Sequence, residues 1–286
     1  MTFSGPLTRF IVAYHKTMEN KKFQNLLDIL KEMQSVLLAY SGGVDSTFLL
    51  KAIQVSGISA LSVTASSELI PYGDVLTAQG IAEELGIKHK IIKTNILSMD
   101  EFVSNTPERC FFCKDTLYKE LQAIALTEGY RFMLDGSTLN DINDFRPGRK
   151  AAQRYHVRSP LIEADLSKDE VRKLSQQLGL ATWDKPSSPC LATRFPYGRR
   201  ITKEVLNRVE MAENFLKSLG FSEVRVRDHG FVARIEVRQE EIDLVLDHGK
   251  RDAISATLKS LGYAFISIDL DGYHSGSMNR VLKKST

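Results

Sequence analysis

Three cysteines are the residues of this chain best suited to metal or redox chemistry. Cys110 and Cys113 flank two phenylalanines in the string CFFCK, and Cys190 follows in SSPCLATRF. Thiols at C-x-x-C spacing can share one metal or redox centre. Three thiolates are too few for a closed four-cysteine zinc site, although a histidine could supply a fourth ligand. An iron–sulfur cluster with one open iron, and inert thiols in an apolar core, are the other interpretations that the spacing leaves open.

A second group of residues, the string AYSGGVDS at positions 39–46, is suited to binding phosphate. Small residues let the backbone approach an anion, and the N–H groups of the loop and of a following helix would point at it. Ser41 and Ser46 add hydroxyls, and Asp45 puts a carboxylate where a phosphate-bound Mg²⁺ could sit. The string is neither the Walker pattern, because no lysine follows the glycines, nor G-x-G-x-x-G. The alternative is a glycine turn without a ligand, but the full string after an apolar strand favours a nucleotide-binding loop.

Alternating strands and helices are predicted to position these residues. Apolar strand patterns occupy residues 35–40, 60–65 and 88–95, and a fourth strand runs from residue 131 into a loop. Helical patterns occupy residues 22–33, 44–53, 72–86 and 115–129. Such alternation predicts an α/β fold with a doubly wound parallel sheet that is covered on both faces.

The pattern changes after about residue 195, where we expect a smaller α+β domain. An amphipathic helix at 202–221 precedes two alternating strands at 223–237, with a turn at Asp228–Gly230. A helical region at 240–262 with a break at Gly249 and a final strand at 263–273 complete it. The predicted organisation is an N-terminal extension at 1–20, the α/β domain at 21–195 and the α+β domain at 196–286.

Composition limits the classes of function. The chain has 286 residues and a formal net charge of +3, which gives no indication of wholesale nucleic-acid binding. No apolar run is long enough to cross a bilayer, and the N-terminus lacks the pattern of a signal peptide. A low, odd number of cysteines is typical of a reducing compartment, so we expect a cytoplasmic protein.

The glycine string SGGVDS resembles the PP-loop of N-type ATP pyrophosphatases. Those enzymes cleave ATP between its α- and β-phosphates and adenylylate a carbonyl or carboxylate oxygen. The resemblance implies ATP at the carboxyl edge of the sheet. Longer strings resemble the LarE family, the ATP-dependent sulfur transferases of nickel-pincer cofactor synthesis: NTPERCFFCKDTLY, LDGSTLNDINDFRPGRKAA, SPLIEADLSKDEVR, KPSSPCLATRFPYG and VRVRDHGFVARIEV.

This resemblance runs over nearly the whole chain and implies a reaction. In that family, ATP adenylylates a carboxylate of pyridinium-3,5-biscarboxylic acid mononucleotide, sulfur is delivered, and AMP leaves. One kind of member sacrifices a single cysteine, whereas another has three cysteines that are thought to hold a [4Fe–4S] cluster carrying an extra sulfide. This sequence resembles the second kind, because the sacrificial cysteine aligns with Pro189, which cannot donate sulfur.

The resemblance also implies roles for individual residues. Cys110, Cys113 and Cys190 would ligate the cluster, and Lys114 would pair with a phosphate of ATP unless it is an ordinary solvated lysine. The ATP phosphates and Mg²⁺ would be held by Ser41, Gly42, Gly43, Asp45 and Ser46.

A second set of residues is assigned to the substrate and to metal. Arg225 and Arg227 are two apart in a strand and share one face, which suits a phosphate unless it is simply an exposed basic strand face. The resemblance implies the substrate's 5′-phosphate there, and Arg194 is expected to face the same cavity. Glu213 and Glu236 match acidic positions that are tied to metal at subunit contacts in a homo-oligomer, often a hexamer.

Three other functions compete with this assignment. One is a tRNA thiolase of the PP-loop superfamily with a three-cysteine cluster, although this chain has no spare cysteines and almost no net charge. Another is an amide-forming synthetase of the NAD-synthetase type, which has no use for three thiols. A third is a non-enzymatic nucleotide-sensing module with a zinc clip.

Overall fold

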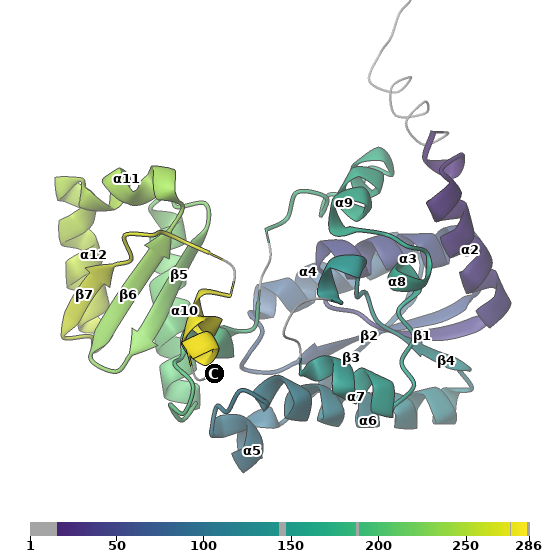
Figure 1. Ribbon diagram of the computed structural model, residues 1–286, viewed down its shortest axis with the longest axis horizontal. Coiled ribbons are helices and arrows are strands. Elements are labelled where there is room, and N and C mark those ends of the chain that lie inside the picture. Colours follow the sequence, from purple (N-terminus) through teal and green to yellow (C-terminus); the bar gives the residue numbers. More distant parts are fainter. Residues whose placement is uncertain (1–15, 143–146, 187–188, 275, 285–286) are drawn as a thin grey trace, which may run out of the picture. The chain divides into compact units, whose positions relative to one another are not determined.

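The computed structural model describes residues 16–142, 147–186, 189–274 and 276–284, which divide into two compact units (Figure 1). The first unit comprises Met1–Ser67, Tyr72–Thr94 and Cys110–Ser188, and the second comprises Glu68–Pro71, Asn95–Arg109 and Pro189–Thr286. The predicted domain boundaries at residues 20 and 195 stay predictions, and residues 1–15 of the predicted extension lie outside the described residues. No helix among the described residues is long and apolar enough to span a membrane.

A parallel sheet forms the centre of the first unit, in the order β3-β2-β1-β4. Its strands are β1 (Ser35–Ala39), β2 (Ser59–Ser66), β3 (Lys88–Lys93) and β4 (Phe132–Leu134). Alternate side chains of β1 enter two different cores, because Val36 and Leu38 pack on one face of the sheet and Leu37 on the other. A strand that is buried on both faces needs a continuous apolar run, so the prediction of a covered parallel sheet is confirmed.

Helices cover both faces of this sheet (Figure 1). The core around Val36 and Leu38 includes residues of α2 (Lys21–Met33), α3 (Val44–Ser56), α4 (Tyr72–Glu84), α8 (Pro160–Glu163) and α9 (Lys168–Gln177). The core around Leu37 includes residues of α6 (Arg109–Glu128) and α7 (Gly148–Arg154). One 3₁₀ turn of this unit, η2 (Leu139–Asp141), follows β4.

The helix that was predicted at 115–129 begins earlier, at Arg109. Cysteine and phenylalanine are mediocre helix formers, so local propensity alone does not extend the helix backwards through CFFCK. Tertiary packing does, because Phe111 packs against the core around Leu37 and the Arg154 guanidinium lies 5.0 Å from the centre of its ring. Cys110 and Cys113 therefore lie in the first turns of a helix.

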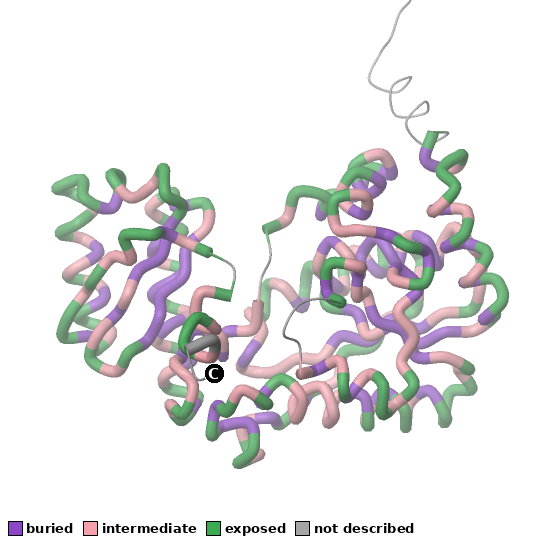
Figure 2. Tube along the Cα trace, in the orientation of Figure 1, coloured by how far each residue is buried: buried purple, intermediate pink, exposed green. Residues whose placement is uncertain are grey.

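The second unit is α+β, as predicted, with a three-stranded sheet in the order β5-β6-β7. Strands β5 (Val224–His229) and β6 (Val232–Val237) are antiparallel, and β7 (Phe265–Ile268) is parallel to β6. The buried side chains of this sheet pack against α10 (Lys203–Ser218), α11 (Ile242–Leu246) and α12 (His248–Ser260). Most residues of β5 and β6 are buried (Figure 2). The shorter elements are η1 (Ile96–Ser98), α5 (Asp100–Val103), η3 (Leu191–Arg194), η4 (Gln239–Glu241) and η5 (Ser277–Lys284).

Two local predictions in the second unit are wrong by one or two residues. The hairpin turn is at Gly230–Phe231, because Asp228 still pairs with Ala233 in the ladder and Gly230 has the positive φ of 85° that a tight turn needs. The helical break falls at Asp247, whose carboxylate accepts from the Lys250 N–H and so caps α12. Gly249 is tolerated inside the first turn that this cap stabilises.

Candidate functional site

The glycine loop joins the end of β1 to the start of α3 in the first unit. Gly43 is the N-cap residue of α3 and supplies no side-chain cap, so the first-turn N–H groups of this 13-residue helix are left without one. Within the loop, the Ser41 and Ser46 hydroxyls lie 3.1 Å apart, and Ser41 Oγ accepts from Gly43 N–H at 3.4 Å. The predicted residues thus come together at an uncapped helix N-terminus, which favours a bound anion.

Two glycines let other chain segments approach this loop closely. Gly42 has a φ of 67°, and a Cβ there would lie 2.8 Å from the Cβ of Ala78 in α4. Gly136, just after β4, would place a Cβ 2.9 Å from the Ser46 nitrogen. Side chains at either position would push these elements apart and distort the loop.

Asp45 lies in the first turn of α3 with its side chain only 22% exposed. Its Oδ2 is 3.5 Å from Lys168 Nζ, whereas Oδ1 is buried without a hydrogen-bond partner. Burial raises the pKa of Asp45, and the Lys168 charge opposes that rise. A buried carboxylate oxygen with unused acceptor capacity suits a hard cation such as Mg²⁺.

Sequence reasoning missed two cations beside the loop. Lys168, at the start of α9, pairs with Asp45, and Lys185 donates to Asp74 Oδ1 at 3.0 Å and to the Gly42 carbonyl at 3.4 Å. Arg172 of α9 fixes the backbone near Lys185, because it donates to the Lys185 carbonyl at 2.9 Å. Both lysines are more than 100 residues from the loop, in the strings SPLIEADLSKDEVR and KPSSPCLATRFPYG, and those strings by themselves do not indicate a contact with it.

The cysteine pair lies at the start of α6, where Cys110 is exposed and Cys113 is half-buried. Residues three apart share one face of a helix, so the two thiols can reach a common ligand. Thiolate ligands are also favoured at the positive end of a helix dipole. The donor set therefore fits two ligands of an iron–sulfur cluster, although no three His, Cys, Asp or Glu side chains gather as a metal-binding group in the part of the chain that the structure describes.

Lys114 connects this helix to the sheet edge. Its Nζ donates to the Tyr118 hydroxyl at 3.2 Å, and Tyr118 donates to Asp135 Oδ2 at 3.2 Å. Burial raises the pKa of Tyr118 to about 12, so its hydroxyl keeps its proton. Asp135 directly follows β4 and precedes Gly136, which touches the glycine loop. The ATP contact predicted for Lys114 stays a prediction.

Cys190 belongs to the second unit, half-buried at the N-cap of η3. Arg194 at the other end of η3 is 3% exposed and makes a two-pronged ion pair with Glu213 of α10, at 2.8 and 2.9 Å. Its Nη1 donates to the Pro189 carbonyl at 2.7 Å and to the Cys190 carbonyl at 3.3 Å. Every nitrogen of Arg194 thus donates a hydrogen bond within the unit. The spacing between Arg194 and Cys190 did not predict that Arg194 would be buried.

Arg225 and Arg227 lie on β5, and both are buried. Arg225 lies over the Tyr273 ring at 4.8 Å and 3.8 Å from Glu223. Burial, and then the Arg194 charge, lower the pKa of Arg225. Arg227 donates to Glu236 at 2.5 Å and to the Thr193 carbonyl at 3.1 Å.

The charged residues that were predicted to bind phosphate or metal thus have ion-pair partners inside the protein. Glu213 also accepts from Val226 N–H at 3.0 Å, and Glu236 also pairs with Arg234 at 3.0 Å. The structure therefore brings Cys190, Arg194, Arg225, Arg227, Glu213 and Glu236 into one region of the second unit. Their assignments to substrate phosphate and to metal stay predictions.

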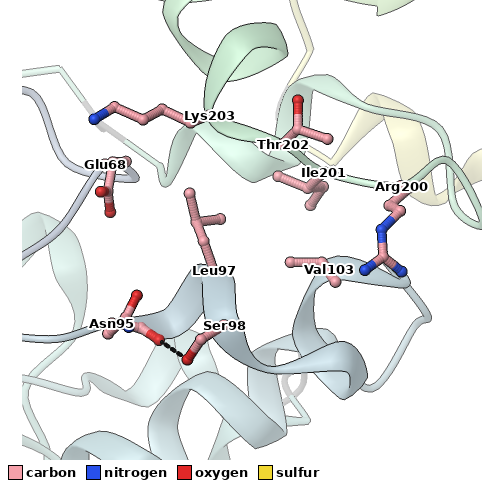
Figure 3. Close-up of a pocket in the computed structure, with 9 residues that line it drawn as sticks. All are labelled: Glu68, Asn95, Leu97, Ser98, Val103, Arg200, Ile201, Thr202 and Lys203. Carbon is pink, nitrogen blue, oxygen red and sulfur yellow. Dashed lines mark hydrogen bonds between the residues drawn. The ribbon is translucent and has the colours of Figure 1, made fainter.

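A separate cavity of about 380 Å³ lies in the second unit and is lined by none of the predicted residues (Figure 3). Leu97, Val103 and Ile201 supply apolar side chains to it. Charged side chains come from Glu68, Arg200 and Lys203, and polar ones from Asn95, Ser98 and Thr202. This mixture of both charges and apolar groups selects no single class of ligand.

Comparison with known proteins gives full-length relatives. The chain is 42% identical over 268 residues, 93% of its length, to the whole of an uncharacterized protein of Synechocystis sp.. It is 41% identical over 271 residues, 94% of its length, to 97% of the pyridinium-3,5-bisthiocarboxylic acid mononucleotide synthase of Lactiplantibacillus plantarum.

A more distant similarity covers part of the chain. The tRNA-specific 2-thiouridylase MnmA of Rickettsia africae is 25% identical over 225 residues, which span 64% of this chain and 60% of that protein. No protein-family model matches the chain.

Proposed function

The chain belongs to the family of the pyridinium-3,5-bisthiocarboxylic acid mononucleotide synthase, the LarE family, and on that premise we propose that it is an ATP-dependent sulfur transferase. Its substrate is pyridinium-3,5-biscarboxylic acid mononucleotide, and its product serves nickel-pincer nucleotide synthesis. The observation that supports this most is the uncapped N-terminus of α3, with the buried Oδ1 atom of Asp45 in its first turn.

The first half-reaction activates a carboxylate of the substrate. A carboxylate oxygen attacks the α-phosphorus of ATP, the bond to the oxygen that bridges the α- and β-phosphates breaks, and pyrophosphate leaves. The N–H groups at the start of α3 and the Ser41 and Ser46 hydroxyls hold the phosphates, because anions bind at helix N-termini. Asp45 would hold a Mg²⁺, which would supply positive charge to the departing pyrophosphate.

The second half-reaction replaces oxygen by sulfur. Hydrosulfide attacks the acyl carbon, the carbon–oxygen bond to AMP breaks, and the sulfur loses its proton to solvent, which leaves a thiocarboxylate and AMP. A [4Fe–4S] cluster held by Cys110, Cys113 and Cys190 would supply the sulfide in deprotonated form. Arg225 is assigned to the phosphate of the mononucleotide, since guanidinium groups bind phosphate well, whereas Arg227 already donates to Glu236 and to the Thr193 carbonyl.

The substrate class is tested by direct competition between two acceptors. The anaerobically reconstituted protein is incubated with ATP, Mg²⁺ and sulfide, and with either the biscarboxylate mononucleotide or bulk tRNA. We expect AMP, pyrophosphate and the mass change of one oxygen-to-sulfur exchange with the mononucleotide only. Sulfur incorporation into tRNA, with none into the mononucleotide, would refute this function in favour of the thiolase.

A further inference from the structure

The backbone around Cys190 is held by three buried arginines of the second unit. Arg109 donates to the Ala192 carbonyl at 2.9 Å, Arg194 to the carbonyls of Pro189 and Cys190, and Arg227 to that of Thr193 at 3.1 Å. The three arginines are 5%, 3% and 4% exposed. Arg109 and Arg227 reach this five-residue segment, 189–193, from distant points of the chain, whereas Arg194 directly follows it.

Each of these arginines is fixed in turn by a partner behind it. Arg194 is paired with Glu213 and Arg227 with Glu236, while Arg109 donates to the side-chain oxygen of Asn105. A buried guanidinium is costly unless its N–H groups are satisfied, and its planar donors fix the groups that they bind. The arginines that hold this segment are therefore themselves held in place.

The contacts fix both peptide planes that flank the Cys190 Cα atom. The plane before it is held through the Pro189 carbonyl. The plane after it is held through the Cys190 carbonyl, which also accepts from Thr193 N–H at 3.0 Å and Thr193 Oγ1 at 2.9 Å, and through Leu191 N–H, which donates to Leu69. With both planes fixed, rotation about χ1 is the one torsion left to direct the thiol.

We propose that Arg109, Arg194 and Arg227 form an arginine cradle that positions the Cys190 thiol. Arg194 is then a positioning residue, not a contact of the substrate phosphate. The proposal rests on the proposed function for the use that is made of Cys190, but the cradle itself is testable without ATP or sulfur transfer.

The test measures the reactivity of Cys190 in the metal-free protein. Each thiol is alkylated with iodoacetamide, and peptide mass spectrometry gives the rate for Cys190 relative to Cys110. Arg194→Lys keeps the charge but cannot bridge Glu213 and two carbonyls. We expect Cys190 to react about tenfold faster in this variant. Losing a charged hydrogen bond should make local opening of the segment around Cys190 more frequent by about that factor.

The matched control is Arg208→Lys. Arg208 pairs with the buried Asp228 in the same unit, and none of its hydrogen bonds or ion pairs reaches residues 189–195. It should lower stability without changing the relative rate of Cys190. An unchanged Cys190 rate in Arg194→Lys, or an equal rise in Arg208→Lys, would overturn the cradle.

Two further readouts make the test independent of one variant. In the wild-type protein, the Leu191 and Thr193 amides should exchange hydrogen as slowly as those of β5, and rapid exchange would also overturn the proposal. In a single turnover, Arg194→Lys should release pyrophosphate at the wild-type rate but form AMP and thiocarboxylate more slowly. If the wild-type protein transfers no sulfur, the proposed function fails. The alkylation rates still test whether the arginine cradle positions Cys190.

Discussion

Gly42 is the residue whose substitution tests the nucleotide loop most simply. Gly42→Ala adds a strained φ and a Cβ 2.8 Å from Ala78, so we expect the free energy of unfolding to fall by more than the ~1–2 kcal/mol of a positive φ alone. ATP binding, measured by calorimetry, should weaken as well.

Gly57→Ala is the matched control at the opposite end of α3. Gly57 has a φ of 71°, but nothing lies within 4 Å of the added Cβ. It should show the backbone strain alone and bind ATP normally. Equal destabilisation by the two substitutions, with unchanged ATP binding in both, would show that the close approach of α4 to the loop is unimportant.

Asp45 gives a second prediction at this scale. Asp45→Asn keeps the shape of the side chain but removes the charge that would bind Mg²⁺, so AMP formation should fall by about 10²-fold or more. Because burial raises the pKa of Asp45, the wild-type rate should decline on acidification at a higher pH than an exposed aspartate would cause. A wild-type rate in Asp45→Asn would remove this residue from the site.

The sequence predicts such residues only where they form a motif. The string Ser41–Ser46 is local, so its spacing indicates its use. Lys168 and Lys185 reach the same loop from distant segments. Arg194 and Arg227 are buried, although the sequence pattern predicted that both would be accessible to a substrate phosphate. Those placements depend on tertiary contacts, which no local pattern encodes.

At the scale of elements, α9 connects helix α2 to the nucleotide loop. Its capping box joins Ser167 and Glu170, and Lys22 of α2 pairs with Glu170 at 2.9 Å. Hydrogen bonds from Ser167 and from Lys22 lower the pKa of Glu170 to about 2. The same helix supplies Lys168, which pairs with Asp45, and Arg172, which holds the backbone at Lys185, so its start should affect both stability and ATP binding.

Acid should therefore weaken this cap in a defined range of pH. A carboxylate whose pKa is lowered on folding stabilises the protein above its unfolded pKa, and that contribution is lost as pH falls from about 4.5 toward 2. Glu170→Gln should lower the free energy of unfolding by about 1 kcal/mol at pH 7 and reduce its slope over this range. Urea unfolding at several pH values measures both.

Glu128→Gln is the control for that experiment. It removes a surface ion pair with Lys90 in the same unit and should cost less than about 0.5 kcal/mol. If Glu170→Gln has the same effect as this control at every pH, the capping box does not stabilise α9.

Element boundaries show where local patterns fail. The strands of the parallel sheet were predictable because a strand buried on both faces needs an unbroken apolar run. The start of α6 was not, because packing of Phe111 overrides the low helix propensity of CFFCK. Likewise the break before α12 is set by the Asp247 cap and not by Gly249.

At the scale of the whole molecule, the three cysteines are divided between the two units, with Cys110 and Cys113 in the first and Cys190 in the second. After anaerobic reconstitution with iron and sulfide, the wild-type protein should hold about four iron atoms per chain. Cys110→Ser, Cys113→Ser and Cys190→Ser should each lower that content, as measured by iron and sulfide analysis. A colourless protein that keeps one zinc ion per chain would contradict the cluster.

The central claim is that this protein catalyses ATP-dependent sulfur transfer with its cysteines intact. The most direct measurement counts thiocarboxylate and AMP formed per chain from the biscarboxylate mononucleotide with excess sulfide, followed by mass analysis of the protein. We predict several thiocarboxylates per chain, one AMP for each, and three unaltered cysteines. Product that stops at one per chain with loss of a cysteine sulfur, or AMP release without sulfur in the product, would contradict it.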